Sequence, residues 1–545
     1  MAKRRFLDDV PGVKAPRANF NLSHRVATTM KPGLLHPIDI VEVLPGDTWT
    51  VDSAQLVKLS TPLIRPIMDD VYLDTYSFFV PLRLTYDQLE NVFGNSSPSS
   101  YEEVDLAEIP KFPIVLSNGA GFNMPPSGGV MDYLGYPSTI SVSESLKGLN
   151  SYYSILPVRA FALIWNEFFR NQQVDQECNV NLTSVVAQSE LPNVNAWGPT
   201  NYSGKLPPVR RYGDYFSTAL LAPQKGPAVK IPINGAPVIS AGSTHLHGGR
   251  MLFSDSSNVL ISGDLKMVEG QVVSQTDTVA PGSYIAGSNM VVDDGGTINA
   301  LRTAFQLQKY LERDAFYGSR YREYLYSAFG VMSQDSRMQV PEFLGGTHNR
   351  LQVSQIMSTA NTSDVAQGQF SGQISSLSEK NLKFSKSIPE HGYIITVACI
   401  RYKHLYSQAV QKLFFRFDRE DFYDKLFSNL GQQAINSNQL LGGGSETHPI
   451  IGYQEAYAEY RTILDRVTGQ MRPESGNLGQ FWSLADRFDS VPSLVDLVHE
   501  QTDSFNRVLA ATTDTQDPFV VDFNFRCSVA RVVSPYSMPG YADHH

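Results

Sequence analysis

The chain has 545 residues and a mass of 60.4 kDa, which is long enough to bury several hydrophobic cores. Its 42% apolar and 11% aromatic residues indicate a globular fold, while its 40 glycines and 32 prolines argue against a coiled coil or a helical repeat array. A net charge of −10 excludes a surface that is basic throughout, so any contact with nucleic acid requires a local basic segment.

Residues 1–35 are predicted to form a basic, extended N-terminal arm. Up to Lys31 they carry seven lysines and arginines against two aspartates, and prolines and glycines interrupt any regular period. The alternative is a solvated terminus that contacts nothing. No apolar segment follows the basic residues, so we expect no signal peptide, and no apolar run in the chain is long enough for insertion into a membrane.

Five segments have the residue pattern of β-strands. They are rich in β-branched and aromatic residues or alternate between apolar and polar positions, and they cover residues 36–44, 48–52, 71–80, 391–402 and 519–529. The last is the clearest, because its apolar residues follow a strict period of two. That period predicts one face against a core and one face toward solvent or a partner, with Cys527 as a buried small hydrophobic residue.

Two segments have the 3-and-4 spacing of amphipathic helices, residues 157–170 and 299–313, and a weaker third covers 418–430. Between them, residues 222–299 are dense in Gly, Ser, Thr, Val and Asp and read as a β-rich surface insertion. The pattern of short strands with long, partly helical connections favours an antiparallel β-sandwich with large insertions. A doubly wound α/β sheet fits poorly, because strands and helices do not alternate.

Motifs for catalysis or metal binding are not found in the sequence. It contains no P-loop, no GxSxG, no HExxH and no EF-hand loop, and its three cysteines lie too far apart for a zinc site or a disulfide framework. His245 and His247 could face one side of a strand, but no third ligand is evident, so a surface turn is favoured. We therefore predict no catalytic residues, no metal and no cofactor.

Aromatic residues and arginines alternate between residues 320 and 326. Such a cluster can stack bases and hold phosphates, anchor a contact between subunits, or simply fill a core. Core or subunit interface is favoured over nucleic acid. The candidates are Arg320, Tyr321, Arg322 and Tyr324.

A set of strings along the chain is recognisable when they are taken together and in order. The strings are Pro37–Trp49, Tyr76–Leu84, Leu156–Gln173, Leu206–Gly226, Leu301–Ala315, Tyr321–Val331, Pro341–Gly346, His391–Ile395, Gly452–Arg461 and Ser537–Tyr541. No single string decides the matter, but their joint order over nearly the whole chain is highly specific. Together they resemble the major capsid protein family of the Microviridae, the small tailless single-stranded DNA phages, and specifically its gokushovirus branch. The family tends to have a Trp-rich segment where this chain reads TYDQLE at residues 85–90, and residues 222–299 match no segment of the family.

The resemblance implies an eight-stranded antiparallel jelly-roll β-sandwich of the viral capsid type, with large loop insertions that contain several α-helices. Residues 36–221 and 300–545 would form this core, and residues 222–299 would be the variable insertion that builds a protrusion at each threefold axis. It implies a T=1 icosahedral shell of sixty copies around a circular single-stranded DNA genome. The basic arm would lie inside, with its phosphate contacts made by Lys3, Arg4, Arg5, Lys14, Arg17 and Arg25.

The resemblance also implies the partners. They are further copies of the chain, the genome, an internal scaffolding protein, a DNA pilot protein, a small basic DNA-binding protein and a receptor on the bacterial host. Assembly in the host cytoplasm, followed by residence in the virion, is consistent with a chain that needs no disulfide. Two other classes stay open from the residues alone: a β-rich glycoside hydrolase or lyase, which needs a paired carboxylate in a cleft, and a monomeric glycan-binding adhesin, which would not assemble.

Overall fold

The computed structural model is mainly β, and its named strands all pair antiparallel. Most of the described chain lies in one compact unit, while residues 224–316 form a second unit with its own internal contacts. The structure describes residues 17–65, 67–93, 112–116, 125, 127–138, 152–187, 190, 197–229, 245–247, 250–254, 260–261, 265–268, 271–274, 298–357, 359, 370–377, 380–429, 431–443 and 449–533.

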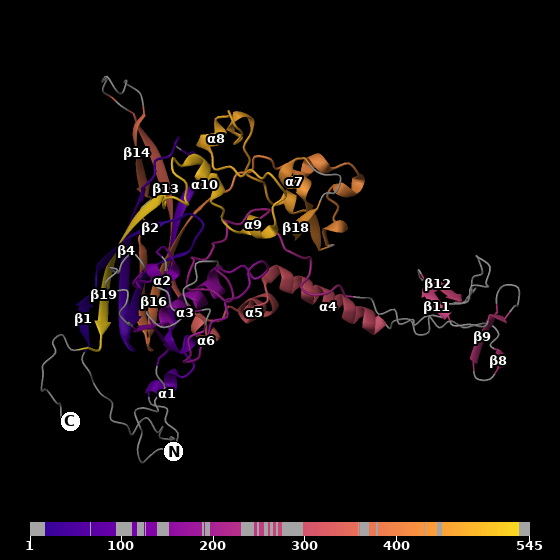
Figure 1. The fold of residues 1–545 in the computed structure, drawn as a ribbon, viewed down its shortest axis with the longest axis horizontal. Coiled ribbons are helices and arrows are strands. Elements are labelled where there is room, and N and C mark those ends of the chain that lie inside the picture. Colours follow the sequence, from indigo (N-terminus) through magenta and orange to yellow (C-terminus); the bar gives the residue numbers. More distant parts are fainter. Residues whose placement is uncertain are drawn as a thin grey trace, which may run out of the picture. The chain divides into compact units, whose positions relative to one another are not determined.

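The first of two large sheets has the order β1-β19-β4-β15, and β2 pairs with the same edge of β19 as β1 does (Figure 1). β1 lies along the last part of β19 and β2 along its first part, so the segment after the first 16 residues is extended and fixed in a sheet. The strands of this sheet are β1 (Ala18–Asn21), β2 (His24–Met30), β4 (Asp47–Leu59), β15 (Leu382–Ile388) and β19 (Phe519–Arg531).

The second large sheet has the order β14-β13-β5-β16-β3. Its longest strand, β13, shifts register between Phe343 and Gly345, where a side chain on Gly346 would collide with the Tyr76 ring. The strands are β3 (His36–Val43), β5 (Val71–Pro81), β13 (Glu342–Met357), β14 (Phe370–Leu377) and β16 (Gly392–Tyr402). Each predicted strand therefore corresponds to an observed one, and in the two large sheets β1, β2, β13, β14 and β15 are additional.

The two large sheets share one apolar core. The strict alternation predicted for residues 519–529 is confirmed, since Phe519, Val521, Phe523, Phe525, Cys527 and Val529 are all buried in that core. The intervening side chains of β19 are exposed or half-buried. From the second sheet, β5 contributes Val71, Leu73 and Phe79 to the same core. The two sheets thus bury facing surfaces against one another, as in a β-sandwich.

A second core covers the other face of the second sheet. On β5 it contains Phe78 and Val80, and on β16 it contains Ile395, Val397 and Cys399. Helices α2 (Val130–Tyr133) and α3 (Leu156–Ile164) pack on this face. Because both faces of the sheet are buried, β5 and β16 read as nearly continuous apolar runs rather than as alternating strands.

The helix predicted for residues 157–170 is confirmed as α3 followed by a π-helical turn, Trp165–Phe169. Pro157 lies in its first turn, where no backbone donor is lost. In the π turn the Arg170 backbone N–H donates to the Trp165 carbonyl, at 2.9 Å. Phe168 and Phe169 are consecutive, yet both rings contact Phe78, with ring centroids 4.6 and 6.0 Å away.

A long connection within the first compact unit joins β16 to β19. It holds α7 (Ser437–Leu441), α8 (Gly479–Trp482), α9 (Leu494–Val498), α10 (Asp503–Val508) and the hairpin of β17 (Gln432–Asn436) and β18 (Ile450–Glu455). A third apolar cluster joins this connection to the segment around Tyr215 and Phe216. The unit also contains α1 (Leu89–Phe93), α5 (Tyr321–Phe329), α6 (Asp335–Met338) and the short pair β6 (Ile114–Leu116) and β7 (Tyr152–Ser154).

The helix predicted over residues 418–430 is wrong. The described part of this segment contains only single 3-10 turns, Arg419–Asp421 and Phe427–Asn429. The carboxylate of Asp421 accepts hydrogen bonds from the backbone N–H groups of Phe417 and Asp418, at 2.8 and 2.9 Å. Such side-chain bonds offer the backbone an alternative to helical pairing, which explains why the apolar spacing did not produce a helix.

The second compact unit contains α4 (Ile298–Tyr317), apart from its last residue, which confirms the helix predicted for residues 299–313. Its described strands are β8 (His245–His247), β9 (Arg250–Ser254), β10 (Leu260–Ile261), β11 (Leu265–Val268) and β12 (Gln271–Ser274). They form a three-stranded and a two-stranded sheet. The side chains of His245 and His247 lie outside the described residues, as does much of the predicted insertion.

Candidate functional site

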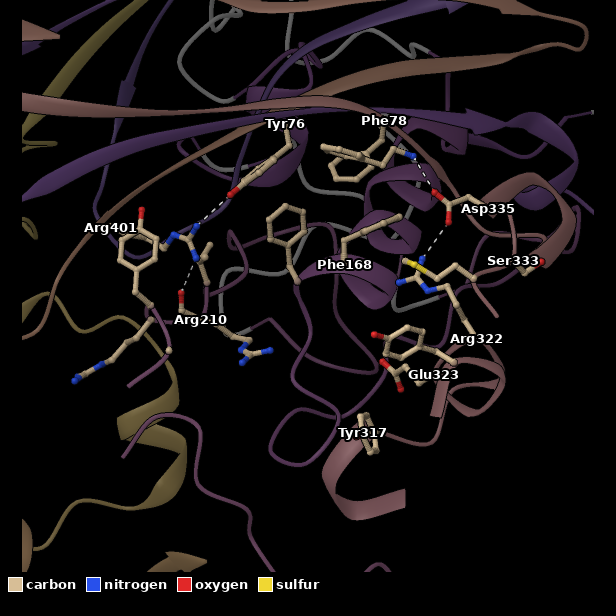
Figure 2. A pocket seen from close by; sticks show the side chains of 18 residues that line it. Tyr76, Phe78, Phe168, Arg210, Tyr317, Arg322, Glu323, Ser333, Asp335 and Arg401 are labelled. Atoms are coloured by element: carbon tan, nitrogen blue, oxygen red, sulfur yellow. Dashed lines mark hydrogen bonds and ion pairs between the residues drawn. The ribbon is translucent and has the colours of Figure 1, made fainter. Parts of the chain in front are cut away.

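A cavity of about 770 Å³ lies against the outer face of the second sheet (Figure 2). Tyr76 and Phe78 of β5 line one wall, and Phe168 and Phe169 of the π turn line another. Further walls come from α5, α6, the start of β13 and the segment around residue 210. Side chains alternate between the two faces of β5. Its odd-numbered apolar residues point into the sandwich core, so the even-numbered Tyr76 and Phe78 point to the outer face, where the cavity lies.

Charged groups of the cavity wall are mostly neutralised within the wall itself. The Arg322 guanidinium donates to Asp335, at 3.1 Å, and lies over the Phe168 ring. Arg401 pairs with the fully buried Asp74 and donates to the Tyr76 hydroxyl, at 3.2 Å. Within the described part of the chain, the exposed Arg210 side chain has no hydrogen bond or ion pair. The cavity is therefore an aromatic hollow with one uncompensated positive charge, able to receive an anionic or aromatic group.

The predicted cluster of residues 320–324 lies at the start of α5, where its members have different environments. Arg320 is engaged within the subunit, since it donates to the Asn166 carbonyl and to Glu323 and lies 3.8 Å from Glu167. Arg322 lines the cavity. Tyr321 is exposed and stacks on Tyr324, with ring centroids 6.4 Å apart. Of the four candidates only Tyr321 is exposed, whereas the arginines hold α5 against its own chain.

The predicted DNA contacts divide into two groups. Lys3, Arg4, Arg5 and Lys14 lie outside the described residues. Arg17 is exposed, and its guanidinium lies beside Gly46. Arg25 of β2 makes a two-pronged ion pair with Asp522 of β19, with both N–O distances at 2.6 Å, which raises the pKa of Arg25. The Arg25 charge is therefore already balanced inside the sheet.

Sequence reasoning missed a buried ionic cluster in the connection from β16 to β19. The His404 ring lies 2.8 Å from Asp486 through Nδ1 and 2.9 Å from Glu500 through Nε2, and Arg211 donates to the same Asp486, at 2.6 Å. Burial disfavours the charged ring, but Glu500 and Asp486 outweigh it and raise the pKa of His404 to about 9. Nothing in the sequence signals this cluster, because its members are nearly 290 residues apart.

A second buried ion pair joins Arg159 of α3 to Glu190, and both side chains are fully buried. The Arg159 guanidinium also donates to the carbonyl oxygens of Thr85 and Thr183, at 3.1 and 3.0 Å. Each charged side chain in these clusters faces an oppositely charged one, although Glu500 Oε2 is buried without a hydrogen bond, and the pairs fix the loops that carry them. In the described part of the chain, no three His, Cys, Asp or Glu side chains gather as a metal site would require. None of the described helices is long and apolar enough to cross a membrane.

Comparison with known proteins gives the class. Residues 8–541 match the family described as capsid protein (F protein), so the chain belongs to this family of phage capsid proteins. It is a structural protein that self-assembles into a shell and becomes part of the virion, and the family is not known to be enzymatic.

The relatives identify the branch. The chain is 32% identical to capsid protein VP1 of Spiroplasma virus 4 over 97% of its length and 96% of that protein. It is 30% identical to VP1 of Chlamydia phage 1 over 99% of its length and 98% of that protein. For VP1 of Bdellovibrio phage phiMH2K the identity is 33%, over 97% of this chain and 96% of the relative. All three are gokushoviruses of the Microviridae, which confirms the resemblance drawn from the sequence.

Proposed function

We propose that this capsid protein forms a T=1 icosahedral shell of sixty copies that encloses a circular single-stranded DNA genome. The observation that carries the proposal is the order of strands in the two large sheets. Eight strands in chain order, β2, β3, β4, β5, β13, β15, β16 and β19, pair as a folded ribbon: first with last, second with seventh, third with sixth and fourth with fifth. An eight-stranded jelly roll, a fold used by viral capsids, is expected to have this pairing, which supports the proposal.

The jelly roll accounts for the remaining pairs as well. β19 pairs with β4, and β16 pairs with β5, which closes the ribbon into one sheet of β2, β19, β4 and β15 and another of β3, β16, β5 and β13. β1 and β14 extend the edges of these sheets. The long connections between paired strands, including the one that contains α3, are then helix-bearing insertions into the sandwich.

The proposed contact with DNA depends on the basic arm. Because Arg25 is paired with Asp522, we assign the proposed phosphate contacts to Lys3, Arg4, Arg5, Lys14 and the exposed Arg17. Such contacts neutralise phosphates without reading bases and weaken with salt. Replacing these five residues by glutamine is expected to lower the mass of DNA protected in each particle, and Arg25→Gln serves as a control. Unchanged DNA content in otherwise normal particles would contradict this role.

Residues 222–299 are proposed to build the protrusion at the threefold axes and to contact the receptor on the bacterial host. Support comes from their Gly- and Ser-rich composition and from the separate compact unit that spans residues 224–316. Shortening residues 230–297 should leave shells intact and reduce attachment to host cells. Loss of assembly would instead assign the segment to the shell. An internal scaffolding protein, a DNA pilot protein and a small basic DNA-binding protein complete the proposed partners, with assembly in the host cytoplasm.

The shell itself is tested by co-expressing the chain with its scaffolding protein and treating the purified product with nuclease. Light scattering should give the mass of sixty subunits, and the phage-derived particle should retain protected single-stranded DNA. A uniform monomer, both from co-expression and from the phage, would contradict the proposed shell.

A further inference from the structure

The segment from Lys412 to Phe427 and its neighbours around residue 460 present apolar side chains to solvent. We call this surface the 412–427 patch. Phe417, Leu426 and Ile463 are the most exposed, at 81%, 82% and 87%. Leu413, Phe414, Phe422, Tyr423 and Tyr460 are each more than half exposed. At about 150–250 Å² per large side chain, these exposed parts amount to on the order of 1,000 Å². A monomer rarely exposes so large an apolar patch, so the patch indicates an interaction site.

Contacts inside the patch show that it is one surface. Arg416 lies between the rings of Phe422 and Tyr460, with its guanidinium carbon 5.6 and 4.5 Å from the two centroids. The Tyr423 ring lies 5.8 Å from that of Tyr460. Leu413, Tyr460 and Ile463 line the same small cavity. The patch is therefore continuous across two segments that are far apart in the sequence.

The patch contains a hollow as well as projections. The cavity beneath Leu413 and Ile463 has a volume of about 280 Å³, enough for one large side chain. Its charged wall residues are balanced internally, because Lys412 and Arg416 both lie 3.5 Å from Glu459. Phe417 and Leu426 project from the adjoining chain. A surface that carries both a projection and a matching hollow can pair with an identical surface about a twofold axis.

The charge of the patch distinguishes between partners. Residues 412–427 contain four lysines and arginines and four aspartates and glutamates, so the segment is formally neutral. A surface for nucleic acid requires an excess of positive charge, and a strongly basic partner requires the opposite. A second copy of the same neutral, mixed-charge surface requires no excess of either charge. The area also matches the roughly 800 Å² per partner that a stable interface buries.

We propose that the 412–427 patch is the contact between two subunits related by a twofold axis, and that its occupant is the same patch of a second copy. The inference rests on the proposed shell and names one of its contacts. Phe417 of each copy fills the hollow of the other, Leu426 packs beside it, and the aromatic rings around Arg416 form the buried centre. Exposed charges such as Arg419 and Lys425 then meet the acidic residues of the partner at the rim.

Cysteine cross-linking tests the twofold geometry, because one introduced cysteine near such an axis faces its own copy. The variants Phe417→Cys, Leu426→Cys and Ile463→Cys are each made in the full chain, whose three native cysteines are all buried. Mild oxidation of assembled shells should give covalent dimers with at least one of the three. Val185→Cys, 70% exposed and outside the patch, is the matched control and should give none. Absence of dimers from all three patch variants would overturn the proposal.

A charge test separates this contact from the shell as a whole. Phe417→Asp combined with Leu426→Asp should leave the fold unchanged, as read by circular dichroism and thermal unfolding, because both side chains are exposed. Shell yield should fall at least tenfold, with smaller oligomers remaining, while Val185→Asp assembles normally. Normal shells from the double variant overturn the inference but leave the proposed function standing. Intact shells that lack only DNA would also overturn it, by assigning the patch to nucleic acid. Failure of the unaltered chain to form shells would count against the proposed function instead.

Discussion

The two large sheets of the sandwich differ in what covers their outer faces. The outer face of the second sheet is buried under α2 and α3, with Phe78, Ile395 and Val397 in a dedicated apolar core. On the first sheet, the outward side chains of β19, such as Val520 and Asn524, remain exposed in the single subunit. This difference explains the two sequence patterns. Strands of the second sheet are buried on both faces and read as continuous apolar runs, whereas β19 of the first sheet is buried on one face and alternates strictly.

The inner face of β19 gives the largest expected effect. Phe523 is fully buried between the sheets, so Phe523→Asp would place an unpaired carboxylate in an apolar core. We expect no folded protein from this variant, assayed by expression, circular dichroism and particle yield. Asn524→Asp, one residue along on the exposed face, should fold normally. Folded, assembled protein carrying Phe523→Asp would refute the assignment of the two faces.

A milder pair of substitutions compares the two outer faces themselves. Phe78→Ala on the second sheet removes a ring that packs against Phe168 and Phe169. It should lower the free energy of unfolding by about 3–5 kcal/mol. Val520→Ala on the first sheet should lower it by about 0.5 kcal/mol or less, because that side chain is exposed. Urea unfolding of the dissociated subunit measures both, and equal losses would mean that the outer faces do not differ as described.

The smallest expected effect concerns pH and contrasts β3 with the connection that follows β16. Burial lowers the pKa of His36 in β3 to about 4, so its contribution to stability is complete above pH 6.5 and disappears as pH falls through 4. His404 has its pKa raised to about 9, so its contribution is complete below pH 6.5 and disappears as pH rises through 9. Stability should therefore be greatest near pH 6.5.

The measurement is the midpoint of urea unfolding of the dissociated subunit between pH 6.5 and 9. Over that interval His404, which faces Glu500, Asp486 and Arg211, should account for up to about 3 kcal/mol. His24, one-third exposed beside Asp39, adds a smaller contribution of the same sign. His404→Gln should flatten this alkaline limb, and a second series between pH 6.5 and 4 should leave the acid limb of His36 in place. An unchanged alkaline limb in this variant would show that the buried cluster does not govern it.

Patterns of apolar residues in the sequence predicted the strands and helices whose faces are set by local periodicity. β19, β5, β16 and α3 all belong to this group. β2 alternates too, but it forms only because β19 lies beside it, and its partner is nearly 500 residues away in the chain. The 418–430 segment failed for the opposite reason: its spacing is helical, but the carboxylate of Asp421 accepts backbone hydrogen bonds that stabilise a turn.

The candidate sites were less accessible from sequence than the fold. The aromatic and basic character of residues 320–324 was visible in the sequence. The sequence did not indicate that Arg320 would bond to the Asn166 carbonyl and to Glu323 of its own chain. The cavity of Figure 2 and the His404 cluster depend on side chains from several loops, whose proximity only the tertiary structure creates. Family resemblance, in contrast, was carried by short strings spread along the whole chain, and the comparisons agree with it.

A reconstruction of the purified particle by electron cryomicroscopy is the decisive test of the capsid account. The account predicts sixty copies in a T=1 shell, each with β2, β19, β4 and β15 in one sheet and β3, β16, β5 and β13 in the other. It also predicts the 412–427 patch at the twofold axes and residues 222–299 at the threefold protrusions. A particle without icosahedral symmetry, or subunits whose sheets follow another strand order, would contradict it.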